Sequence, residues 1–219
     1  MKSEKCMQKF ILISLIILSA RIGVAQISAV TSKGDEVVLY DNGTWKYVSD
    51  PDTLAKEIPI SNTRYTKKNT SSFEVKSTVT PNVSVFINPK VWSFEKSKEG
   101  HAREYTFQLK GKDAYGMLIT ERIGIPIEAL KNLALKNAKK AAPDIKLIKE
   151  EYRFVNSVKV LFLQMNGTIQ GVEFSYCGYY YSSRSSSVQF ITYTARNLLN
   201  EYKASLDDLL NGLSVVEEK

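Results

Sequence analysis

Hydrophobic and polar positions are arranged in different ways along the chain and divide it into four parts. A continuous apolar run lies near the N-terminus, and a short alternating stretch follows at residues 36–48. Residues 50–82 are polar and rich in Ser and Thr, and from residue 83 onward alternating and helical patterns follow each other closely. A period of two indicates strands and a period of 3.6 indicates amphipathic helices, so this pattern predicts most elements.

The dense C-terminal part predicts seven strands and two helices. The first helix begins at Pro126, whose fixed φ suits the first helical position, and Lys139 and Lys140 lie near its negative end. The second helix begins near Leu199 and ends at Gly212, which we expect to be left-handed. The predicted strands cover residues 83–87, 105–109, 114–123, 145–154, 158–165, 168–181 and 188–195.

The connections between the last four strands are short, so strands that follow each other are expected to pair as hairpins. Asn166-Gly167 is the expected turn between two of them. Residues 83–215 are therefore predicted to form an α+β domain. Its mainly antiparallel sheet has six or seven strands and lies between helices in an α/β/α sandwich.

Residues 26–49 are predicted to form an N-terminal β-hairpin. Asn and Gly in the sequence Asp41-Asn42-Gly43 accept the positive φ of a tight turn. An isolated hairpin is marginally stable in water, so we expect it to dock on its own domain or to present Trp45 to a partner. Residues 50–82 are predicted to be a polar linker, in which 73–75 is a candidate first strand of the main domain.

Residues 1–25 are typical of a secretory signal peptide. Three lysines precede the apolar run Phe10–Ala20, and Gly23-Val24-Ala25 supplies the small residues of a cleavage site. The run is shorter than the roughly 20 residues needed to cross a membrane, and no cysteine follows it as a lipobox requires. We expect cleavage after Ala25 and a secreted or periplasmic protein that does not span the membrane.

The formal charge of +7 falls when this segment is removed. Four cationic residues and one acidic residue leave with it, so the mature chain keeps a charge of +4. The remaining basic residues are spread along the chain and are not interleaved with aromatic side chains, as a nucleic-acid groove requires. We therefore expect no nucleic-acid partner.

The side chains that carry most enzyme chemistry are scarce. His101, in a polar turn, is the one histidine, and Cys177 is the one cysteine that remains after cleavage. Motifs for a serine nucleophile, a zinc hydrolase or a phosphate loop are absent. We predict no catalytic residue, no metal site and no cofactor. Cys177 is interpreted as a buried small hydrophobe, with a reactive or dimer-forming thiol as the alternative, in a monomer or weak dimer.

The most unusual stretch is the tyrosine-rich segment 173–184. Tyrosine and arginine side chains are suited to stack on a sugar, an aromatic group or a partner protein. A simpler interpretation is a strand whose alternate tyrosines pack against a helix while the others cover a sheet face. Together with the hairpin tryptophan, this segment supplies the candidate contact surface, which consists of Trp45, Tyr176, Tyr179, Tyr180, Tyr181 and Arg184.

Four features occur in a characteristic order: the sequence Asn88–Trp92, the helix from Pro126, the run Val158–Gly167 and a closing Tyr193-Thr194 strand before the last helix. In this order, residues 89–213 resemble the fold family of the PsbP extrinsic proteins of photosystem II, the bacterial DcrB-like lipoproteins and the Ran-binding Mog proteins. The resemblance extends to uncharacterised exported proteins of Bacteroidota, which carry a similar N-terminal hairpin. It implies an α/β/α sandwich used as a non-enzymatic binding or assembly module.

These features predict an exported, non-catalytic binding or accessory protein of a bacterial envelope, with an envelope protein or a glycan as partner. The alternative is a small hydrolase or glycan-modifying enzyme that uses Asp, Glu or Tyr without a recognisable motif. An enzyme requires a deep pocket with converging ionisable groups, whereas a binding module is expected to have a shallow apolar or aromatic patch.

Overall fold

The computed structural model describes residues 27–31, 36–48, 57–98 and 103–216. They belong to two compact units. The small unit lies within residues 1–29 and 36–50, and the main unit contains the rest of the chain. The predicted signal peptide and His101 lie outside the described residues.

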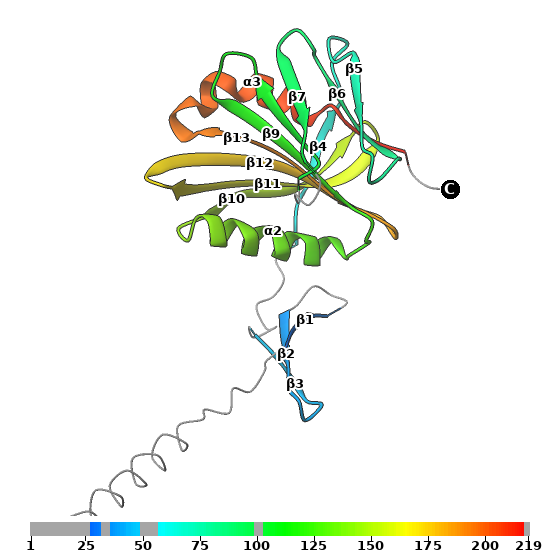
Figure 1. Cartoon of the computed structure of the whole chain (residues 1–219), viewed down its shortest axis with the longest axis vertical. Helices are drawn as coiled ribbons and strands as arrows, with labels where there is room; N and C mark the ends of the chain where they lie inside the picture. The colour runs from blue at the N-terminus through cyan, green and yellow to red at the C-terminus, as the bar shows by residue number, and fades with distance from the viewer. Residues whose placement is uncertain (1–26, 32–35, 49–56, 99–102, 217–219) are drawn as a thin grey trace, which may run out of the picture. The chain divides into compact units, whose positions relative to one another are not determined.

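A three-stranded sheet in the order β1-β2-β3 makes up the small unit (Figure 1). Its strands are β1 (Ile27–Val30), β2 (Glu36–Leu39) and β3 (Trp45–Tyr47). β2 and β3 pair antiparallel on either side of the predicted turn, in which Gly43 has a φ of 79°. Trp45 is 53% exposed on this unit and contacts the Tyr47 ring edge-on.

An eight-stranded sheet forms the centre of the main unit, in the order β4-β10-β11-β12-β13-β9-β8-β7. These strands are β4 (Ile60–Tyr65), β7 (Trp92–Lys96), β8 (Tyr105–Leu109), β9 (Ala114–Glu121), β10 (Lys146–Val155), β11 (Val158–Ile169), β12 (Val172–Ser182) and β13 (Ser187–Ala195). A second sheet has the order β14-β6-β5, with β5 (Phe73–Lys76), β6 (Val83–Ile87) and β14 (Leu213–Val215).

The α+β class is confirmed, but the predicted count of six or seven strands is wrong, and the central sheet is mixed. β4 lies at one edge of the sheet and pairs with β10 in parallel, whereas the other neighbours are antiparallel. β4 and β5 both lie within residues 50–82, which the sequence predicts to be a polar linker. The sequence of β4 shows no alternation of apolar and polar residues, because most of its side chains are exposed, as is usual for an edge strand.

Two layers cover the opposite faces of the central sheet (Figure 1). Helix α2 (Ile127–Ala141) lies on one face, and α3 (Leu199–Leu210), preceded by the 3₁₀ turn η1 (Arg196–Leu198), lies on the other together with the second sheet. The larger hydrophobic core lies on the α3 face and includes Phe107, Phe190 and Leu209. A smaller core lies beneath α2. Neither α2 nor α3 has the length and apolar character needed to span a membrane.

Two glycine predictions are wrong for related reasons. The turn between β11 and β12 lies at Gln170-Gly171, where both residues have positive φ, and not at Asn166-Gly167. A Cβ at Gly167 would lie 2.7 Å from the Ile145 side chain, so this glycine permits close packing inside a strand. Gly212 also lacks a positive φ, and its backbone lies against β6, where a Cβ would be 2.0 Å from the Phe86 carbonyl oxygen.

Candidate functional site

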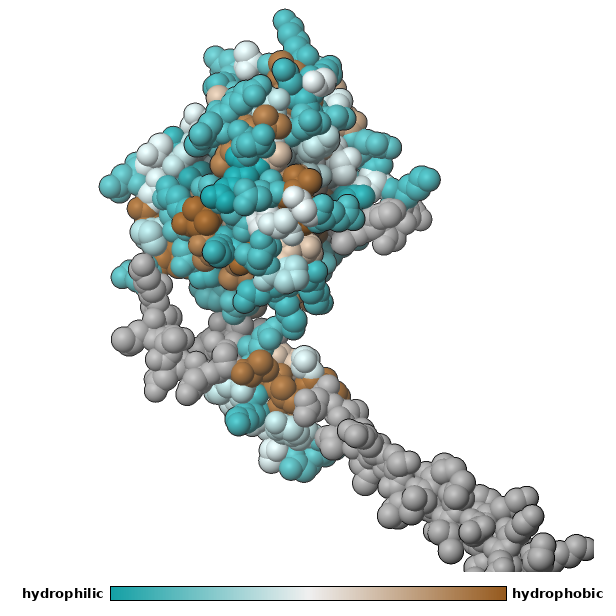
Figure 2. Space-filling model, turned by 90° about the vertical axis from the view of Figure 1, so that its left-hand side faces the viewer, coloured by the Kyte–Doolittle hydropathy of each residue, from teal (hydrophilic) through white to brown (hydrophobic). Residues whose placement is uncertain are grey.

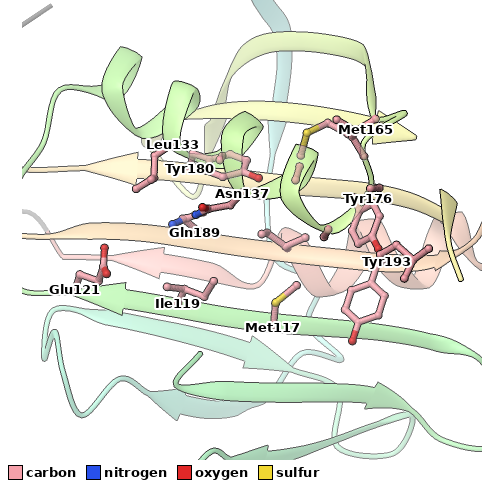
Figure 3. A pocket seen from close by; sticks show the side chains of 17 residues that line it. Met117, Ile119, Glu121, Leu133, Asn137, Met165, Tyr176, Tyr180, Gln189 and Tyr193 are labelled. Atoms are coloured by element: carbon pink, nitrogen blue, oxygen red, sulfur yellow. The ribbon is translucent and has the colours of Figure 1, made fainter. Parts of the chain in front are cut away.

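A cavity of about 440 Å³ lies between α2 and the central sheet and is the leading candidate for a functional site. Its size falls in the range of small-molecule pockets, roughly 300–1,000 Å³. Its walls come from α2, from strands β9, β11, β12 and β13 and from residues just after α2 (Figure 3). The surface shown in Figure 2 is largely hydrophilic and carries only separate hydrophobic patches on the main unit. The apolar side chains of this candidate site line a cavity, whereas the sequence predicts a shallow patch.

Small side chains on α2 create this space. Ala134, Ala138 and Ala141 are spaced by four and three residues, so they lie on one side of the helix, and all three line the cavity. On the sheet side, Gly178 of β12 leaves room for the ring of Tyr180, because a Cβ at Gly178 would lie 2.9 Å from a ring carbon. The helix thus covers the sheet without filling the volume between them.

The strand register gives the cavity two different ends. Tyr176 of β12 is paired with Tyr193 of β13, and two residues further along Gly178 is paired with Ile191. The next inward-facing pair is Tyr180 with Gln189. Figure 3 shows this order. Tyr176, Tyr193 and Met165 lie at one end of the cavity, and apolar side chains follow. The polar end consists of Tyr180, Gln189, Asn137 and Glu121.

Tyr180 occupies an unusual position at the polar end. Its side chain is 0% exposed, and its hydroxyl has no hydrogen-bond partner among the described residues. Burial, with a smaller contribution from Cys177, raises the pKa of Tyr180 well above its usual range, so the hydroxyl keeps its proton. Since a buried hydroxyl without a partner is destabilising, such groups are uncommon in folded proteins.

The opposite end carries a row of stacked tyrosines. The ring centroids of Tyr176 and Tyr193 are 5.7 Å apart, and those of Tyr193 and Tyr115 are 5.4 Å apart, with interplanar angles of 30° and 24°. Burial, reinforced by Tyr193, raises the pKa of Tyr176. Burial also raises the pKa of Tyr193, so the hydroxyls of Tyr176 and Tyr193 are neutral at physiological pH, and this end combines aromatic surface with uncharged polar groups.

The five residues of the candidate contact surface that belong to the main unit do not lie together. Tyr176 and Tyr180 line the cavity, whereas Tyr179 is 1% exposed on the opposite face, where burial raises its pKa to about 12. Tyr181 is half-buried against the same core as Tyr179, and Arg184 is exposed in the loop after β12. Trp45 belongs to the small unit. The alternation of tyrosines along a strand explains this better than a common surface does.

Arg153 and Cys177 form a second polar region, on the α3 face. The Arg153 guanidinium lies 3.4 Å from the Phe162 ring centroid, and its Nη2 is 2.7 Å from Glu151 Oε1. Cys177 is half-buried beside them, and burial raises the pKa of its thiol to about 11. The thiol is therefore protonated at neutral pH, as expected for a structural cysteine. Within the described ranges, no cluster of three or more His, Cys, Asp or Glu side chains is arranged to hold a metal ion.

Sequence reasoning missed most of the cavity. Its residues come from five elements, and Met117, Gln189 and Ile191 carry no pattern that separates them from ordinary sheet residues. The one sequence feature that indicates the cavity is the spacing of Ala134, Ala138 and Ala141. Three small residues on one side of a helix leave a volume between that helix and the layer that it covers.

Comparisons with known proteins bear on the fold. No protein-family model matches the chain, and no curated protein matches it in sequence. Among solved structures, cyanobacterial PsbP (CyanoP) from Synechocystis sp. PCC 6803 matches with a TM-score of 0.50 and 14% identity, covering 66% of this chain and 92% of that protein.

Two further solved structures are similar at a lower level. LpqN, described as involved in cell envelope biogenesis of Mycobacterium tuberculosis, has a TM-score of 0.46 and 9% identity, with 66% of this chain and 90% of LpqN covered. A protein of unknown function from Pseudomonas aeruginosa has a TM-score of 0.42 and 13% identity, with 58% and 83% covered. The match to CyanoP agrees with the element order found in the sequence, and this chain therefore has the PsbP-like fold.

Proposed function

We propose that this protein is an exported, non-catalytic accessory protein of a bacterial envelope whose main unit binds a small, largely apolar molecule. The observation that carries the proposal is the cavity of about 440 Å³ under α2, which is lined mainly by Ala, Ile, Leu and Met and by tyrosine rings. Removing apolar ligand surface from water stabilises a complex by roughly 25 cal/mol per Å² before the opposing entropy of binding.

The export part of the proposal rests on the N-terminal sequence, in which three lysines, an apolar run and small residues follow one another. Proteins with the PsbP-like fold serve different tasks, so the fold itself does not decide between them. The cavity under α2 gives the accessory role a definite molecular form, the binding of a ligand.

A binding role fits the cavity better than hydrolysis does. Glu121 is the single carboxylate among the described residues that line the cavity, whereas glycoside hydrolysis by the usual route requires a pair of carboxyl groups. The tyrosines there are held neutral by burial, which favours hydrogen bonding over proton abstraction. We therefore propose that the ligand is released from the cavity without chemical change.

Binding of diphenylhexatriene tests this proposal, because this pure hydrocarbon fluoresces strongly only in an apolar environment. We expect saturable fluorescence with the wild-type protein. Ala138→Phe places a ring in the cavity and is expected to weaken binding at least tenfold, since Ala138 lines it. Lys139→Phe adds the same ring at the adjacent exposed position and is expected to bind like wild type.

Circular dichroism and thermal unfolding establish that both variants are folded. Equal loss of binding in both variants, or no saturable binding by wild type, would contradict the proposal. Native mass spectrometry of protein purified from its own envelope then identifies any retained molecule, and its release unaltered in mass after incubation supports binding without turnover.

A further inference from the structure

We infer that the ligand is a neutral amphiphile: a hydrocarbon body with an uncharged oxygen-bearing group that hydrogen-bonds to Tyr180. This inference rests on the proposed function and specifies its ligand class. Three observations carry it: the unpartnered Tyr180 hydroxyl, the charge of the lining and the polarity gradient along the cavity.

The first observation is the buried Tyr180 hydroxyl, which lacks a hydrogen-bond partner within the described ranges. The side chain lines the cavity, its hydroxyl is buried, and no described residue accepts or donates a hydrogen bond to it. The hydroxyl is closed off in the free protein, so a movement of neighbouring side chains brings an alcohol, carbonyl or ester oxygen of the bound molecule to it as that partner. Because the desolvation of the hydroxyl has already occurred in the free protein, the new hydrogen bond adds to affinity without that opposing term.

The lining excludes an anionic group. Glu121 is the one charged side chain among the described lining residues, and no Lys or Arg of the described ranges lines the cavity. A carboxylate or phosphate placed there would lose its hydration without gaining a cation, which is strongly unfavourable. The buried amide of Gln189 and the amide of Asn137 offer further uncharged donors and acceptors at the same end.

The arrangement also orients the ligand. Tyr180, Gln189 and Asn137 lie together at one end of Figure 3, while Ile191 and Met117 occupy the next pair of positions along the strands. An uncharged head at the polar end places a hydrocarbon chain over Ile191 and Met117, toward the stacked Tyr176 and Tyr193. The ligand is thus long and polar at one end.

Competition experiments with the full-length mature protein test this inference. 1-Decanol and decanoate carry similar chains and differ in head-group charge, and both are measured by displacement of diphenylhexatriene at pH 8. We expect decanol to bind at least tenfold more tightly than decanoate. In Tyr180→Phe, the ratio of decanol affinity to diphenylhexatriene affinity is expected to fall about tenfold, which corresponds to the 1.4 kcal/mol of one hydrogen bond.

The unfolding of ligand-free Tyr180→Phe supplies a second readout. Because the hydroxyl has no partner among the described residues, its removal is expected to leave the melting temperature unchanged or raised. Decanoate binding as tightly as decanol, or an unchanged affinity ratio in Tyr180→Phe, would overturn the inference while diphenylhexatriene binding by wild type still upheld the cavity. Absence of diphenylhexatriene binding would instead contradict the proposed function itself.

Discussion

Individual buried polar side chains in this molecule fall into two groups, those whose partners are complete and those whose partners are missing. Glu104 belongs to the first group. Its carboxylate accepts hydrogen bonds from the Ser77 hydroxyl at 2.7 Å, from the backbone and hydroxyl of Thr78 and from the Thr120 hydroxyl. Tyr180 belongs to the second. The contrast separates a structural acid from a hydroxyl that has no hydrogen-bond partner among the described residues.

Replacement of Glu104 tests the structural role through pH. Burial alone would raise the pKa of Glu104, but the hydrogen bonds from Thr120, Ser77 and Thr78 outweigh burial and hold it below the ordinary 4.5. A carboxyl whose pKa is lowered by folding stabilises the native state above its unfolded pKa, and this stabilisation disappears as the pH falls through the folded value. Glu104→Gln is expected to lower the free energy of unfolding by about 2 kcal/mol at pH 7, because the amide group faces donors.

Urea unfolding at pH 7 and near pH 3 measures this difference. The gap between wild type and Glu104→Gln should narrow at the lower pH, whereas the exposed Glu74→Gln should change stability little at either pH. A gap that stays constant with pH would show that Glu104 contributes through packing alone.

The tyrosine-rich strand illustrates how far residue-level prediction reaches. Alternation predicts that neighbouring tyrosines face opposite sides, and Tyr179 and Tyr180 do so. It does not predict that the Tyr180 hydroxyl lacks a partner in the described part of the chain, because that depends on Gly178, on the α2 alanines and on the register of β12 with β13. The sequence pattern therefore predicts which face of the sheet a tyrosine occupies, whereas tertiary packing determines the hydrogen bonds that its hydroxyl makes.

At the level of elements, the predictions succeed where periodicity is strong. Both helices are present, and the alternating runs of the C-terminal half became strands. The predictions fail where one residue type serves two different structural roles. Glycine permits both positive φ and close backbone approach, and the sequence alone does not separate them: Gly171 adopts a φ of 81°, whereas Gly212 lies against the Phe86 carbonyl.

Alanine substitution at these two glycines distinguishes their roles. Gly212→Ala places a Cβ 2.0 Å from the Phe86 carbonyl oxygen, so α3 and β6 have to separate, and we expect a loss of about 3 kcal/mol. Gly171→Ala meets no atom within 4 Å and adds only left-handed strain of about 1 kcal/mol. Denaturant unfolding measures both. An equal loss in the two variants would contradict the close approach at Gly212.

For the whole molecule, the boundary of the folded unit is the main difference from the sequence prediction. The polar composition of residues 50–82 predicts a linker, yet this segment contributes β4 to the central sheet and β5 to the second sheet. It also supplies Ser77 and Thr78 to Glu104, and Tyr65, whose ring lies 4.5 Å from the Arg153 guanidinium. The amino-acid composition reflects the exposure of side chains, and the side chains of edge strands such as β4 are largely exposed although the strand pairs with the sheet along one side.

Truncation places this boundary experimentally. A chain that begins at residue 57 retains β4 and β5 and is expected to unfold at a temperature close to that of the mature protein. A chain that begins at residue 83 loses both strands and also Ser77 and Thr78, which donate to Glu104, and we expect its melting temperature to fall by about 10 °C or more. Equal melting temperatures for the two truncated chains would restore the linker interpretation.

The two faces of the central sheet differ in packing: one carries the larger hydrophobic core, and the other carries the cavity. The larger core with α3 lies on one face, and the cavity lies on the other under a helix lined with alanine. Substitutions at Ala134, Ala138 or Ala141 therefore reshape the cavity while leaving the larger core intact. Under the proposed binding function, selection for a new ligand can act on a few helix positions with little loss of stability, so homologous chains can diverge in ligand preference while keeping one fold.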